Sequence, residues 1–306
     1  MDKEQATVKP GLRTNVKIIY HFGAPFAENE HLIWSLRKDT ILLAENGVSA
    51  PRPKKFKTLI PTIISDLDGK LPNRAEQESF FNIVSSGDPV DRIILSNPNF
   101  IGAPTWMLSG GMFFPNAGRN IFNIRSILPD NPSEFYIGIS NPVTCLSAAF
   151  GAQTSRSHRQ FFNNVELDNI RWSTVVRSIQ KASPDTPITV WCDEDTPIIW
   201  PTILREISGI DPKAEMGGDL DIIKKIMSKE GGERMEAYLQ AHPNLNELQR
   251  RRVKDEFLRK FVLDSAVEEE IDLKGWTDVT VDAMTDIYED DIDFIEQMPG
   301  VTLISA

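Results

Sequence analysis

The sequence has 306 residues, of which 41% are hydrophobic and 25% are charged, and its formal net charge is −11. This composition predicts a globular chain with a sizeable core, and the acidic balance argues against nucleic acid and anionic membrane surfaces as general partners. No apolar run reaches the ~18 residues of a membrane span, and the N-terminus has no apolar core of the signal-peptide kind, so we expect a cytoplasmic protein.

The first predicted element of the fold is a buried strand. Residues 1–15 are polar and predict a flexible lead-in. The nearly continuous apolar run Val16–Phe22 is typical of a strand covered on both faces of a parallel sheet. After a loop, Asn29 can cap a helix that Asn46 and Gly47 would end, and its apolar residues follow helical spacing: Leu32, Ile33, Leu36 and Leu43.

The middle of the chain repeats the order strand, then helix. This order predicts an α/β fold with an open, mostly parallel sheet and helices on both faces. The segment Asn97–Gly118, rich in glycine and proline, is too long for a simple connection and is either a binding loop or a small aromatic core of its own. Further predicted strands are Arg92–Ser96, Phe135–Ile139 and Ile188–Trp191; predicted helices are Phe56–Leu67, Arg74–Val84, Ile121–Leu128, Leu146–Phe150 and Val165–Ile179.

The last third of the chain is charged and favours helices. Residues 210–300 predict a mainly helical extension packed on the sheet, with breaks at Gly217-Gly218 and Gly231-Gly232, and a short final strand at Val301–Ile304. We therefore expect one domain over residues 16–306. Cys145 and Cys192 lie far apart in apolar sequence, which predicts two buried thiols not joined by a disulfide and gives no indication of a metal site.

The loop after the first strand carries a family resemblance. Its sequence, GAPFAENEHL, aligns without a gap with G-x-P-K-T-G-T-T-S-L, the donor loop of the P-loop sulfotransferases. The chain resembles this family, particularly its bacterial sulfotransferase-like members, over roughly residues 16–300. The resemblance implies 3′-phosphoadenylyl sulfate as cofactor and a carbohydrate or small hydroxyl compound as acceptor. The equivalent cofactor-binding positions are Gly23, Ala24, Pro25, Phe26, Ala27, Glu28, Asn29 and Glu30.

A second stretch of resemblance follows the strand FYIGI. In the family an arginine ends this strand, a proline follows two residues later, and a serine covers the 3′-phosphate. Here Ser140 stands at the arginine position, the pair Asn141-Pro142 is kept, and Ser147 lies one residue earlier than the usual serine. Trp276 and the segment Tyr288–Asp291 are similar to sulfotransferase C-terminal regions.

The substitutions in the first loop change its charge. Phe26 replaces the family's lysine, Glu28 its inner glycine, and Asn29 and Glu30 its two threonines. At an effective dielectric of about 20, one like-charge pair at ~4 Å costs roughly 4 kcal/mol, comparable to ~1000-fold in affinity. We therefore expect a degraded donor site. The structural alternative is that the two acids complement a helix dipole beside an Asn cap.

Acid–base candidates are few. Sulfotransferases commonly use a histidine or glutamate to deprotonate the acceptor. The resemblance therefore makes His21, Glu28 and His31 catalytic candidates, each with a purely structural alternative. His158, beside Arg156 and Arg159, either faces an anionic ligand or lies in a surface loop.

Three functional hypotheses result: a sulfotransferase-like protein that is inactive or altered in ligand, an active sulfotransferase, and a non-catalytic binding or scaffold protein.

Overall fold

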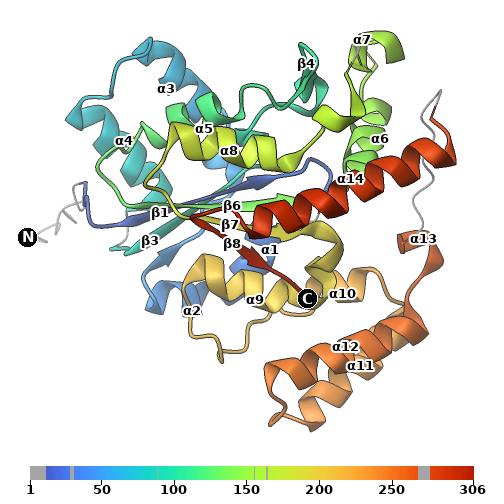
Figure 1. Cartoon of the computed structure of the whole chain (residues 1–306). Coiled ribbons are helices and arrows are strands. Elements are labelled where there is room, and N and C mark those ends of the chain that lie inside the picture. The colour runs from blue at the N-terminus through green and yellow to red at the C-terminus, as the bar shows by residue number, and fades with distance from the viewer. Residues whose placement is uncertain (1–11, 28–30, 88, 155, 163–164, 268–275) are drawn as a thin grey trace, which may run out of the picture.

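The fold is described by a computed structural model that covers residues 12–27, 31–87, 89–154, 156–162, 165–267 and 276–306 (Figure 1). Within these ranges the chain forms a six-stranded sheet with the order β2-β3-β1-β6-β7-β8 and a separate two-stranded sheet. Every neighbouring pair in the large sheet is parallel, which confirms the predicted α/β class. Its strands are β1 (Lys17–Gly23), β2 (Val48–Ser49), β3 (Arg92–Ser96), β6 (Ser133–Ile139), β7 (Ile188–Cys192) and β8 (Val301–Ile304).

Helices cover both faces of the large sheet (Figure 1). The upper face carries α3 (Leu59–Leu67), α4 (Arg74–Ser85), α5 (Ala117–Arg125), α8 (Trp172–Ala182) and α14 (Asp278–Glu296). The lower face carries α1 (Leu32–Leu36), α2 (Thr40–Glu45) and α9 (Thr196–Ser208). Beyond α9 lie α10 (Asp221–Lys225), α11 (Lys229–Ala241) and α12 (Glu247–Phe261), followed in the chain by α13 (Asp264–Val267). Near the carboxyl end of the sheet lie α6 (Pro142–Ala152) and α7 (His158–Phe162).

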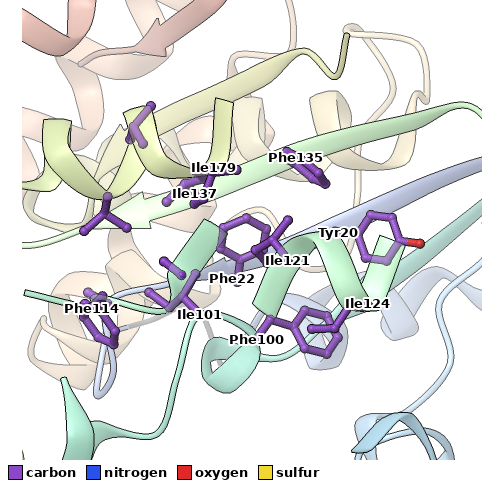
Figure 2. Packing of buried hydrophobic residues seen from close by; sticks show 14 of the residues in the cluster. Tyr20, Phe22, Phe100, Ile101, Phe114, Ile121, Ile124, Phe135, Ile137 and Ile179 are labelled. Carbon is purple, nitrogen blue, oxygen red and sulfur yellow. The ribbon is translucent and has the colours of Figure 1, made fainter. Parts of the chain in front are cut away.

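Strand β1 is central and buried on both faces, as its apolar run predicts. Ile18 pairs with Ile93 of β3 on one side and with Ser133 of β6 on the other. Ile18 packs into the core above the sheet and Ile19 into the core below it, and neither is exposed. Figure 2 shows the upper core, where α5 and α8 pack on Tyr20 and Phe22 of β1. A strand covered on both faces needs no polar residue at alternate positions, which explains its composition.

The helix expected after the first loop is broken. A 3₁₀ turn at Arg37–Asp39 separates α1 from α2, and Gly47, with φ +64°, follows the end of α2. Helix α1 begins after His31, whose side chain makes no cap hydrogen bond, and the predicted cap Asn29 lies outside the described residues. Sequence reasoning also missed β2 and α9.

Two helix predictions were wrong for reasons of packing. The predicted helix from Val165 starts only at Trp172, because the carboxylate of Asp291 on α14 accepts the Ser173 N–H at 3.0 Å and so caps α8. Gly231 lies inside α11 instead of breaking it: a Cβ atom there would meet the Cβ of Phe261 at 2.3 Å. The glycine allows α11 and α12 to approach each other.

The buried aromatic residues of the long segment after β3 join the upper core instead of forming a small core of their own. Three-residue 3₁₀ turns at Pro98–Phe100 and Pro104–Trp106 lead into the antiparallel hairpin of β4 (Leu108–Ser109) and β5 (Met112–Phe113). The ring of Trp172 on α8 contacts Phe113 and Phe114, with centroid distances of 4.9 and 5.7 Å. The remaining 3₁₀ turns are Pro53–Lys55, Leu167–Asn169 and Asp193–Asp195.

Candidate functional site at the carboxyl edge of the sheet

The two stretches that resemble sulfotransferases lie side by side. Parallel pairing of β1 with β6 places Gly23 opposite Gly138. The first loop therefore leaves the sheet beside the segment that begins at Ser140. In open α/β sheets, ligands bind in the crevice outside the carboxyl ends of the strands. This edge of the sheet is consequently the candidate ligand-binding site.

The start of the first loop is held tightly against β6. A Cβ atom on Gly23, whose φ is +155°, would lie 2.0 Å from the carbonyl oxygen of Gly138. The same oxygen accepts the N–H of Ala24 at 2.8 Å. This amide therefore completes the sheet, whereas in a phosphate-binding loop successive N–H groups point at the ligand.

The rest of the described loop is apolar. Phe26 adopts φ +66° and is 53% exposed, while Pro25 is buried and Ala27 packs against the upper core. Where the family pattern has a lysine, this chain therefore presents an aromatic ring to solvent. The predicted site residues Glu28, Asn29 and Glu30 lie outside the described residues.

The two histidine candidates have different surroundings. His21 is fully buried: its ring stacks on Trp191 at 5.5 Å between centroids, and its Nδ1 lies 2.8 Å from the Ser96 Oγ. His31 is half-buried at the start of α1, with Nε2 3.2 Å from the Nζ of Lys225. Neither arrangement points a histidine into an open crevice at this edge.

The N-terminus of α6 is occupied by acceptors from the protein itself. Asn141 caps the helix, with its Oδ1 accepting the Val143 N–H at 3.0 Å. The backbone N–H of Asn141 donates to a carboxylate oxygen of Glu194 at 2.7 Å. Ser140, at the family's arginine position, is buried, and its carbonyl accepts the Trp172 Nε1–H at 2.8 Å. Ser147 lies half-buried in the second turn of α6.

Helix α14 closes this part of the edge. Tyr288 donates its hydroxyl hydrogen to the second oxygen of Glu194 at 3.0 Å, and the Asn141 amide donates to Thr285 Oγ1 at 3.0 Å. Burial, and next the negative charge of Glu194, raises the pKa of Tyr288. Burial likewise raises the pKa of the Cys192 thiol, at the end of β7, to about 12. Sequence reasoning missed Glu194, although the run Asp193–Asp195 directly after a predicted strand was a usable signal.

In the basic segment before and within α7, Arg156 and His158 make contacts within the protein, and Arg159 is exposed. Arg156 donates to the carbonyls of Thr105 and Gln160 at 2.7 and 2.5 Å, and its guanidinium lies 4.9 Å from the ring centre of Trp106. His158 packs against Phe162, with a centroid distance of 4.4 Å. The ring of Trp276 also contacts Phe162, with a centroid distance of 5.7 Å. These groups organise an aromatic cluster around α7.

Comparison with protein-family models, with curated proteins and with solved structures gave no match. Across the described ranges, no three His, Cys, Asp or Glu side chains gather closely enough to bind a metal ion. No helix in the same ranges has the length and apolar character needed to cross a membrane.

Proposed function

We propose that this chain is a non-catalytic binding protein with a sulfotransferase-like arrangement whose donor position no longer holds 3′-phosphoadenylyl sulfate. The observation that carries the proposal is the Glu194 carboxylate on the Asn141 N–H, at the start of the helix where the family pattern binds the 3′-phosphate. An acid in this place takes the hydrogen bond that a phosphate would otherwise accept.

Charge supports the same conclusion. A phosphate at ~4 Å from Glu194 would cost roughly 4 kcal/mol at an effective dielectric of about 20. Solvent at this exposed side chain reduces the cost, and moving Glu194 away would break its contacts with Asn141 and Tyr288. Neither Phe26 nor Ser140 supplies the positive charge that would offset it.

The order of the backbone elements supports the proposed likeness to the family. Strand, loop and helix follow one another at β1, and a second strand followed by Asn-Pro lies directly beside it. The chemistry at both places differs from the family pattern. This combination favours a protein that keeps the scaffold for another ligand.

Sulfuryl transfer, the second hypothesis, needs a base at an open acceptor site. His21 is buried between Trp191 and Ser96, and the Nε2 of His31 lies beside the Nζ of Lys225, so neither of these candidates supports that role.

The test is calorimetric titration with adenosine 3′,5′-bisphosphate. The natural chain should not bind the nucleotide at concentrations up to about 1 mM. This corresponds to a binding free energy less favourable than roughly −4 kcal/mol. Restoring the family residues with Phe26→Lys, Glu28→Gly, Asn29→Thr, Glu30→Thr and Ser140→Arg should create measurable affinity, because two repelling charges are removed and two cations are added.

Adding Glu194→Gln to this variant should strengthen binding further, whereas the matched change Glu233→Gln on the exposed side of α11 should not. Each variant must first show a cooperative thermal transition. Micromolar binding by the natural chain would overturn the proposal. Absence of binding by the folded five-residue variant would count against a sulfotransferase-like loop.

A further inference from the structure

A pocket of about 470 Å³ opens at the same edge of the sheet, next to the carboxyl end of β3. Asn97 directly follows β3, and its N–H donates to the carbonyl of His21 on β1 at 3.0 Å. This hydrogen bond holds Asn97, one of the lining residues, beside β1. The chain leaves β1 toward α1 on the lower face and leaves β3 toward α5 on the upper face (Figure 1). Neighbouring strands whose connections diverge in this way form the crevice in which α/β proteins bind ligands.

The pocket has one apolar side and one amide side. Ile60, Pro61 and Ile64 of α3 form the apolar wall. Phe100 and Ile124, both labelled in Figure 2, also line the pocket and belong to the packed upper core. The turn after β3 and helix α5 supply four carboxamides, which form the amide side: Asn97, Asn99, Asn120 and Asn123. A volume of this size suits a small organic ligand.

Two of these amides are already oriented by the backbone. The Oδ1 of Asn97 accepts the Asn99 N–H at 3.0 Å, which leaves its NH₂ group as a donor. The Nδ2 of Asn120 donates to the Ile101 carbonyl at 3.1 Å, which leaves its oxygen as an acceptor. Within the described residues, the side chains of Asn99 and Asn123 form no hydrogen bond with the protein. The amide side therefore presents donors and acceptors together.

The charges of the residues that line the pocket restrict the kind of ligand that it can bind. None of the described lining residues is acidic, and the single cation, Lys57, is exposed at the rim. An exposed lysine adds little affinity, and nothing in the lining pairs with a cationic ligand.

We propose that this pocket binds a small, flat, uncharged ligand with an aromatic or heteroaromatic ring and an amide-type edge that both donates and accepts hydrogen bonds. The ring packs against the α3 wall and Phe100, and the edge meets the carboxamides. The site is separate from the first loop, so it stands whether or not that loop binds a nucleotide.

Benzamide is the probe, and its binding is detected by saturation-transfer NMR and quantified by titration. Its expected Kd is on the order of 1–10 mM, as for a ligand of this size. Benzoate, which lacks the donor, and benzylamine, which is cationic, should each bind at least fivefold more weakly. Asn99→Leu and Asn123→Leu should each weaken benzamide at least threefold, and Ile64→Trp should abolish binding by filling the pocket.

The matched controls are Asn116→Leu, an exposed position before α5, and Ile41→Trp, an exposed position on α2; both should bind benzamide as the natural chain does. If Ile64→Trp does not fold, the Asn99→Leu variant still tests the proposal, because Asn99 is exposed and its replacement should not affect folding. The proposal is overturned if benzamide does not bind, if binding survives the asparagine variants, or if benzoate binds more tightly than benzamide.

Discussion

Gly23 sets the distance between the first loop and strand β6. No side chain fits at this position, because its Cβ would overlap the carbonyl oxygen of Gly138, and the backbone also adopts a positive φ. The close approach in turn lets Ala24 donate to that oxygen. The glycine that resembles the family's loop glycine therefore has a structural role in this chain.

Gly23→Ala should lower the free energy of unfolding by about 3 kcal/mol or more, because overpacking and backbone strain each cost about 1–3 kcal/mol. Urea denaturation measures this loss. Gly69→Ala is the matched control: Gly69 also has a positive φ, of +80°, but nothing lies within 4 Å of its Cβ position. It should lose only about 1–2 kcal/mol. Equal losses for the two variants would contradict the close packing of β1 on β6.

Helix α12 packs on α9 through a buried lysine. Lys254 is 3% exposed, and its Nζ donates to the Ile198 carbonyl at 3.3 Å. Burial lowers the pKa of Lys254 to about 8, against the attraction of Glu247 and Asp219. Relative to an unfolded pKa of about 10.4, holding this charge in the folded protein costs about 3 kcal/mol at neutral pH.

Lys254→Met should therefore raise the free energy of unfolding at pH 7 by about 1–2 kcal/mol, since the lost hydrogen bond to Ile198 offsets part of the gain. Between pH 8 and 10 the folded protein releases the lysine proton while the unfolded chain keeps it. The natural protein then gains stability as pH rises, and the advantage of the variant should shrink.

Denaturation of both proteins across this pH range measures the difference. Lys260→Met, an exposed position on the same helix, should show no such pH dependence. A variant advantage that stays constant from pH 7 to 10 would rule out a lowered pKa for Lys254.

At the scale of the whole molecule, both cysteines report on opening of the upper core. Neither forms a disulfide, as the sequence predicts, and both are buried. Cys145 donates to the Pro142 carbonyl at 3.6 Å, and the raised pKa of Cys192, about 12, leaves about one thiolate in 10⁴ at pH 8.

We therefore expect a disulfide reagent at pH 8 to label both thiols slowly and in parallel with global unfolding, and rapidly in denaturant. Cys145→Ala and Cys192→Ala assign the two signals. Labelling of either thiol within seconds in the folded protein would show that it is accessible without global opening.

The sequence alone determined the covered strands. Val16–Phe22, Arg92–Ser96 and Ile188–Trp191 were predicted within a residue or two of β1, β3 and β7, because burial on both faces requires a local apolar run. The short final strand Val301–Ile304 was also predicted. Alternation of strands and helices was enough to indicate a parallel α/β fold.

Tertiary structure decided the strand order and the chemistry of the site. Asp291 sets the start of α8 from 118 residues away, and Glu194 occupies the Asn141 amide from 53 residues away. The pocket combines Asn97 with α3 and α5, which the chain reaches by separate connections. Such contacts join segments that have no local pattern in common. Periodicity and spacing therefore predicted the elements, and only packing showed which polar groups meet.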